Sequence, residues 1–195
     1  MPRVGVLALQ GDVREHVSML EQLGVEVVRV RRTAHLDDLD GLIMPGGEST
    51  TIARLLTTSG LREDLETRLR GGLPVLGTCA GLILLSREVL DGRADQWSTA
   101  SLDVAVRRNG YGRQMASFES SVDVKGAGRV PGVFIRAPKI ESWSYRVEVL
   151  ASHDHGNGEY PVLVRQARAW GCSFHPELTG DSRVHKLFLE TLDCR

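Results

Sequence analysis

Apolar runs and amphipathic stretches alternate along the first part of the chain. Residues 3–9 form a nearly continuous apolar run, which is typical of a strand covered on both faces. Apolar residues at helical spacing then predict a helix over 13–23, and Gly24 is placed to end it. Residues 25–30 predict a second strand. A strand, a helix and a further strand in this order indicate a βαβ unit.

The same alternation continues to about residue 90. Short apolar runs predict strands at 42–44 and 73–77. Helical spacing predicts helices at about 50–57, 61–70 and 81–90. Strands that are each followed by a helix favour a parallel sheet with helices on both faces.

A different pattern dominates the second part of the chain. Period-2 alternation and short apolar runs predict strands at 102–106, 118–124, 133–135, 145–150, 162–165 and 170–174. An amphipathic helix over 181–192 closes the chain. We therefore predict one α/β domain over residues 1–195, a three-layer sandwich with a central, mostly parallel sheet and antiparallel additions in the second half.

Composition and charge fit an ordinary soluble domain. The 195 residues include 24 Lys and Arg against 25 Asp and Glu, and 42% are hydrophobic, so a core can form without disulfides. The net charge of −1 argues against a nucleic-acid partner. Nearly all the cations are arginines, which favour bidentate contacts with carboxylates.

The cysteines and the N-terminus indicate a reducing compartment. The chain has only three cysteines, an odd number that suits the cytoplasm better than a disulfide framework. Residues 1–4 lead straight into the first strand without the features of a signal peptide. No apolar run approaches the ~20 residues that span a bilayer. We expect a cytoplasmic protein that does not enter a membrane.

The segment Gly77-Thr78-Cys79-Ala80-Gly81 has the G-x-C-x-G pattern of a nucleophile elbow and lies between a predicted strand and a predicted helix. Its glycines permit the strained turn that exposes a nucleophile. The helix N-terminus favours a thiolate at Cys79, and the Ala80 N–H can donate to an oxyanion. The alternative is a small, inert core cysteine in a glycine turn.

His175-Pro176-Glu177 follows the last predicted strand and supplies a candidate base. Residues i and i+2 of an extended segment point to the same side, so Glu177 can hydrogen-bond to His175 and fix its tautomer. A strand-terminal turn with a solvated histidine is the alternative. Beside a cysteine elbow, the catalytic interpretation is favoured.

A third motif, Pro45-Gly46-Gly47-Glu48-Ser49-Thr50, ends another strand, where open α/β sheets bind ligands. The Gly47 amide could complete an oxyanion hole with the Ala80 N–H. Ser49 or Thr50 could cap the next helix. The alternatives are a tight turn with a cap, or a phosphate loop, which lacks its lysine pattern here.

With further motifs, the chain resembles the glutaminase subunits of pyridoxal 5′-phosphate synthase, a family of class I glutamine amidotransferases with a flavodoxin-like fold. The quoted motifs lie between residues 5 and 178: Gly5 to Gly11, Pro45 to Thr50, Gly77 to Gly81, Arg108 to Gln114 with Ser117 to Glu119, Phe134 to Pro138, and Ser173 to Leu178. Gly110-Tyr111 departs from the more usual Ala or Ser followed by Phe.

This resemblance implies hydrolysis of L-glutamine to glutamate and ammonia, with no cofactor and no metal. It assigns Cys79 as nucleophile, His175 as general base and acid, and Glu177 as the residue that orients His175. The positions that match the family's glutamine-binding residues are Gly47, Glu48, Ser49, Arg108, Ile135 and Arg136. Glu48 would accept the substrate's ammonium, whereas Arg108 and Arg136 are both candidates for its carboxylate.

The resemblance also implies a partner. The ammonia would pass to a synthase subunit, within a large hetero-oligomer, that makes pyridoxal 5′-phosphate from ribose 5-phosphate and glyceraldehyde 3-phosphate. Gln10 would contact that subunit, and helix 13–23 is a candidate docking surface. His16 on this helix either contacts the partner or faces solvent. A glutaminase serving another synthase and a non-catalytic regulatory subunit are the alternatives.

Overall fold

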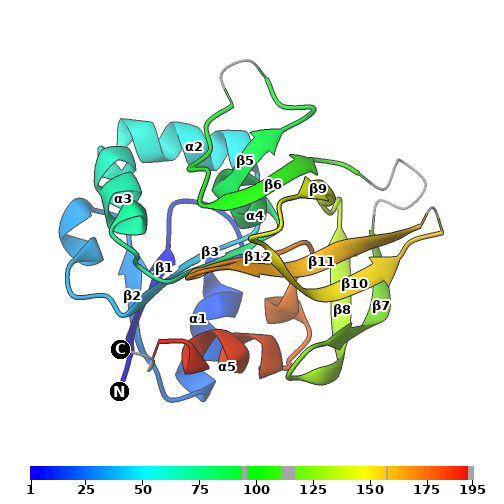
Figure 1. The fold of residues 1–195 in the computed structure, drawn as a ribbon. Helices are drawn as coiled ribbons and strands as arrows, with labels where there is room; N and C mark the ends of the chain where they lie inside the picture. The colour runs from blue at the N-terminus through cyan, green and yellow to red at the C-terminus, as the bar shows by residue number, and fades with distance from the viewer. Residues whose placement is uncertain (94–95, 111–116, 157, 193–195) are drawn as a thin grey trace.

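The computed structural model describes residues 1–93, 96–110, 117–156 and 158–192. Its centre is a seven-stranded sheet of order β10-β11-β12-β4-β3-β1-β2 (Figure 1). The strands are β1 Arg3–Leu7, β2 Glu26–Val30, β3 Gly41–Met44, β4 Val75–Thr78, β10 Glu148–Asp154, β11 Glu159–Gln166 and β12 Ala169–Cys172. From β12 to β2 all neighbours pair in parallel, whereas β10 and β11 add to one edge in antiparallel fashion.

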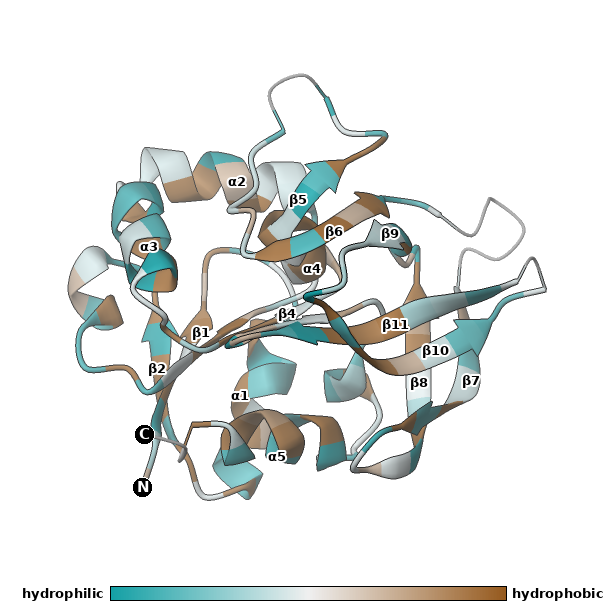
Figure 2. Ribbon diagram, in the orientation of Figure 1, coloured by the Kyte–Doolittle hydropathy of each residue, from teal (hydrophilic) through white to brown (hydrophobic). Residues whose placement is uncertain are grey.

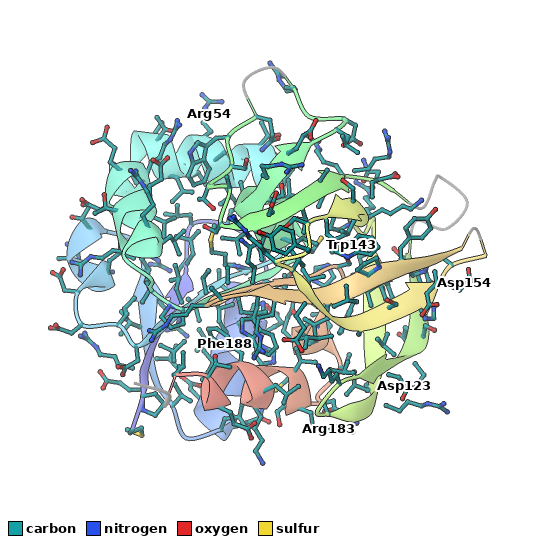
Figure 3. The ribbon with its side chains drawn as sticks, in the orientation of Figure 1. Arg54, Asp123, Trp143, Asp154, Arg183 and Phe188 are labelled. Atoms are coloured by element: carbon teal, nitrogen blue, oxygen red, sulfur yellow. The ribbon has the colours of Figure 1, made fainter. Side chains whose placement is uncertain are left out.

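Helices cover both faces of this sheet, as Figure 1 shows. One face carries α2 Ser49–Thr58, α3 Leu61–Arg70 and α4 Ala80–Leu85, and the other carries α1 Val13–Gln22 and α5 Arg183–Glu190. The two apolar cores follow the period of two along each strand: Leu42 and Met44 pack on the α2–α4 side and Ile43 on the α1–α5 side. Figure 3 shows Phe188 of α5 beneath the sheet.

Two small sheets extend the molecule beyond the central one. β5 Ser86–Val89, β6 Leu102–Arg107 and β9 Lys139–Trp143 form one, and β7 Ser117–Val124 with β8 Gly128–Ile135 forms a hairpin. Short 3₁₀ turns occur at Thr33–Leu36 and Pro176–Leu178. The ends of β6 and β8 bring Arg108 and Ile135 toward the carboxyl ends of the parallel strands.

The predicted α/β architecture, with antiparallel additions late in the chain, is confirmed. The helix expected over 81–90 is wrong in length, because α4 ends at Leu85 and residues 86–89 pair with β6 as β5. Every residue of α4 is buried, and Figure 2 shows the helix in hydrophobic colours, so it has no polar face to extend. Strand β9 was not expected, and residues 145–147 are not part of β10. No helix among the described residues is long and apolar enough to cross a membrane.

Candidate active site

Cys79 lies in a strained turn between β4 and α4. Its φ is +48°, a region that non-glycine residues rarely adopt. The two flanking glycines are required by close approach: a Cβ on Gly81 would lie 2.0 Å from the Met44 carbonyl oxygen, and one on Gly77 would lie 2.5 Å from the Gly81 backbone. The Cys79 N–H donates to the Cys172 carbonyl of the neighbouring β12 at 2.8 Å. The sheet therefore holds the thiol at the carboxyl end of its central strands.

His175 and Glu177 follow β12 and form a buried pair. His175 Nδ1 and Glu177 Oε1 are 2.8 Å apart, and both side chains are almost fully buried. The His175 backbone N–H donates to the Val133 carbonyl of β8 at 2.8 Å, which fixes the segment. His175 Nε2 is buried without a hydrogen-bond partner of good geometry among the described residues. This leaves Nε2 free to exchange a proton with a thiol or a substrate.

Charge around His175 favours the protonated ring. Burial alone lowers the pKa of His175, but hydrogen bonding to Asp12, Cys79 and Glu177 outweighs it and raises that pKa to about 12. Burial raises the pKa of Glu177, against the opposing effect of its bond to His175. A protonated ring that lines the cavity can give a proton to a leaving group.

Two polar residues near the pair were not assigned to the site from the sequence. Asp12, which precedes α1, places Oδ2 3.3 Å from His175 Nδ1. His16, expected to face solvent or a partner, is instead fully buried, with Nε2 3.5 Å from Glu177 Oε2. A signal existed for His16, because it lies between Val13 and Leu20 on the apolar stripe of α1. Asp12 shares the carboxyl end of β1 with Gln10.

A cavity of about 430 Å³ opens beside the thiol. It brings together the six residues predicted to bind glutamine, the nucleophile and its base, the predicted partner contact Gln10, and three residues not predicted for the site. Its lining comprises Gln10, Asp12, Gly47, Glu48, Ser49, Cys79, Ile83, Arg108, Asn109, Ile135, Arg136 and His175. Glu177 and Ala80 are buried and do not line the cavity. The oxyanion-hole role of Gly47 and Ala80 stays a prediction.

The loop after β3 is held by the turn after β1. Gln10 Oε1 accepts the Glu48 N–H at 2.9 Å, and a Cβ on Gly11, whose φ is +103°, would lie 1.7 Å from the Gly46 carbonyl oxygen. The prediction that Ser49 or Thr50 caps α2 is wrong. The cap is Glu48, whose carboxylate accepts the N–H groups of Thr50 at 3.0 Å and Thr51 at 2.7 Å. These bonds hold the pKa of Glu48 below its usual value, although burial opposes them.

The two candidate arginines enter the cavity from different segments. Among the described residues, Arg108 Nη1 makes only long contacts, at 3.4 Å to Thr50 Oγ1 and 3.5 Å to Gln96 Oε1. Arg136 is exposed and follows β8 with a φ of +45°. Either guanidinium can meet a substrate carboxylate. The part of the arginine-rich motif from Tyr111 to Gln114 lies outside the described residues.

Asp12, His175 and Glu177 also place three possible ligand atoms within 4.8 Å of one another. The Nδ1 atom that would bind a metal is, however, the atom that hydrogen-bonds to Glu177. A second hollow, of about 570 Å³, lies near Leu36, Thr67 and Arg168 and contains no cysteine or histidine among its lining residues. The chemistry therefore centres on the cavity beside Cys79.

Comparisons with known proteins identify the family of this chain. The model of the SNO glutamine amidotransferase family matches residues 6–194. A protein named pyridoxal 5′-phosphate synthase subunit PdxT from Streptomyces avermitilis is 53% identical over 97% of this chain and 93% of its own, and its namesake from Frankia alni is 54% identical over 97% and 94%. A crystal structure described as a glutamine amidotransferase is 48% identical, with a TM-score of 0.90 over 97% of this chain and 98% of that one. The chain that carries this cysteine, histidine and glutamate is a member of the SNO glutamine amidotransferase family.

Proposed function

We propose that this chain hydrolyses L-glutamine to glutamate and ammonia, and that it supplies the ammonia to a synthase subunit that makes pyridoxal 5′-phosphate. The observation that carries the proposal is the arrangement of three residues at the cavity. Cys79 and His175 line it together with all six predicted glutamine-binding residues, and Glu177 hydrogen-bonds to His175 from behind. The names of the relatives from Streptomyces and Frankia support the choice of synthase.

The proposed reaction proceeds in two halves at Cys79. The Cys79 thiolate attacks the side-chain amide carbon of glutamine, and the negative charge that develops on the oxygen is met by the N–H groups of Gly47 and Ala80. His175 Nε2 gives its proton to the leaving nitrogen, so that the C–N bond breaks and ammonia departs from a thioester. A water molecule that loses a proton to His175 then attacks the thioester, which releases glutamate and restores the Cys79 thiolate and the His175 imidazolium.

Substrate recognition in this scheme depends on groups of opposite charge that line the cavity. Glu48 already accepts three bonds, from Thr50 N, Thr51 N and Thr51 Oγ1, which fix its carboxylate in place. A carboxylate has about four acceptor sites, so one is left for the substrate's ammonium. Arg108 or Arg136 would bind the α-carboxylate of the substrate. The Ile135 carbonyl oxygen lies 3.9 Å from Cys79 Sγ, so this part of the backbone borders the reacting atoms.

The partner interaction is proposed to act through the turn after β1. Gln10 holds the Glu48 N–H and lines the cavity, so a subunit that contacts Gln10 would act directly on the loop that contains Gly47. We expect Gln10→Ala to impair the stimulation of glutaminase activity by the synthase subunit. Equal stimulation of the variant and the wild type would contradict this role. The complex is proposed to be a large hetero-oligomer.

The test is glutamate release from L-glutamine by this protein alone and with a cognate pyridoxal 5′-phosphate synthase subunit. Strong stimulation that is lost in Cys79→Ala is the expected result. Activity without response to that subunit would indicate a glutaminase of another synthase. Absence of glutamate release in both conditions, and failure of a glutamine-analogue electrophile to label Cys79, would leave a regulatory subunit.

A further inference from the structure

We infer that His16 is a positioning residue for the proposed triad: its Nε2–H holds the oxygen of Glu177 that His175 does not use. This inference rests on the proposed function, because the orientation of Glu177 matters only if His175 takes part in catalysis. It assigns a role to a fully buried side chain of α1 that the sequence placed at the surface.

Glu177 needs a second partner on geometric grounds. Its side chain is 0% exposed, and Oε1 is occupied by His175 Nδ1 at 2.8 Å. Oε2 is buried and has no hydrogen bond of good geometry within the described residues, yet His16 Nε2 lies 3.5 Å away. A buried carboxylate oxygen is costly unless a donor faces it. His16 is the side chain in the right place to provide one.

The surroundings of His16 decide which of its nitrogens carries the proton. Nε2 faces two oxygens, Thr78 Oγ1 at 3.1 Å and Glu177 Oε2. Nδ1 faces His185 Nε2 at 2.9 Å. A neutral ring has a single N–H, and a lone pair on Nε2 would point at a carboxylate. The proton therefore belongs on Nε2, and Nδ1 accepts from His185 Nε2–H.

The same surroundings keep His16 neutral. The groups that face it are His185 on α5, His175 and Glu177 after β12, and Thr78 at the end of β4. Burial, and then the electrostatic effects of His185 and His175, lower the pKa of His16. In the inferred arrangement Glu177 lies between a neutral ring, with His16 Nε2 3.5 Å from Oε2, and a protonated ring, with His175 Nδ1 2.8 Å from Oε1. Two fixed contacts prevent the carboxylate from rotating away from His175 Nδ1.

Substitution of His16 by Gln or by Asn distinguishes a hydrogen-bonding role of this side chain from a role in packing alone. Gln is long enough to place its NH₂ near the Nε2 position, whereas the shorter Asn reaches only the Nδ1 position. We expect His16→Gln to keep kcat within ~3-fold of wild type and His16→Asn to lower it ~10-fold or more, with little change in KM for glutamine. In His16→Asn the alkaline limb of kcat/KM should also move to lower pH, because a loosely held Glu177 supports the His175 imidazolium less well.

The assays use the full chain with its synthase subunit, and the melting temperature of each variant is measured. Met19→Leu is the matched control, because Met19 is another buried residue of α1 that keeps its volume in this change. It should leave kcat and the pH profile unchanged. Equal activities of His16→Gln and His16→Asn, whether high or low, would overturn the inference.

A measurement on the unmodified chain covers the case in which His16→Asn does not fold. ¹⁵N chemical shifts of the histidine rings report the tautomer of each ring, and we expect His16 to carry its proton on Nε2. A proton on Nδ1 would overturn the inference. Wild-type protein that releases no glutamate would refute the proposed function instead, and the tautomer would still decide whether His16 Nε2 carries the proton that the inference requires.

Discussion

Gly46→Ala tests how firmly the site holds His175. Gly46 needs no unusual φ, so alanine fits its backbone, but the new Cβ would lie 2.5 Å from His175 Cε1 and 2.7 Å from Asp12 Oδ2. Since ordinary contact begins near 3.4 Å, the ring must move by roughly 1 Å. His175 is 4% exposed and bonded to Glu177, so the move has to break good geometry with that carboxylate.

A displacement of about 1 Å at a catalytic group costs ~10²-fold, and we expect kcat/KM for glutamine to fall by that order. The collision involves side chains, so overpacking should cost only ~1–3 kcal/mol of stability. The assay is glutamate release with the synthase subunit, together with the rate of Cys79 alkylation by iodoacetamide and the melting temperature.

Gly60→Ala is the control for Gly46→Ala. Gly60 has a φ of +73° and nothing within 4 Å of its Cβ position, so alanine there costs ~1–2 kcal/mol of backbone strain without touching the site. It should lower the melting temperature and leave kcat/KM unchanged. Wild-type kcat/KM in Gly46→Ala would refute the conclusion that neighbouring atoms fix the position of His175.

Three further changes have definite expected outcomes. Asp12→Asn removes a carboxylate that raises the pKa of His175, so the alkaline limb of kcat/KM should move to lower pH; an unmoved limb would contradict the contact. Burial lowers the pKa of His185 to about 4, below its unfolded value, so stability falls as pH drops from 6.5 to 4. His185→Leu should reduce that loss by ~3 kcal/mol in thermal unfolding at several pH values, and equal slopes for variant and wild type would count against a neutral His185. Glu48→Ala removes the cap of α2 and should cost ~1 kcal/mol while raising KM for glutamine; an unchanged KM would exclude Glu48 from substrate binding.

The local pattern of apolar and polar residues was enough to predict the elements whose buried side chains recur with the period of a helix or a strand. The βαβ unit over residues 3–30 and helices α2 and α3 have the hydrophobic period of their structure, and each ends near a turn residue. α4 was overextended, because its LILL run is apolar on all sides and periodicity has no polar face by which to locate its end. Strand β9 was also missed. Among the described strands it pairs with β6 alone, at the edge of a small sheet.

The residues of the site also differ in how well local sequence predicts them. Cys79 and the His175–Glu177 pair were predictable because each motif contains its own geometry: glycines around a turn, and two side chains on one side of an extended segment. Asp12, just before α1, and His16, within α1, lie more than 150 residues away in sequence from Glu177. They reach the site through contacts that no local pattern encodes. Glu48 as the cap of α2 was also missed, because Ser and Thr at the following positions are the usual cap residues.

The parallel pairing of β12 with β4 determines when during synthesis the proposed nucleophile acquires its base. Cys79 leaves the ribosome on β4, but β12 pairs with that strand, through contacts such as Trp170 with Leu76, only after roughly a hundred more residues have been made. Until then neither His175 nor the carboxylate of Glu177 exists beside the thiol. The nascent chain therefore presents an ordinary cysteine. If the proposed function holds, the thiol and its base meet only in the completed fold.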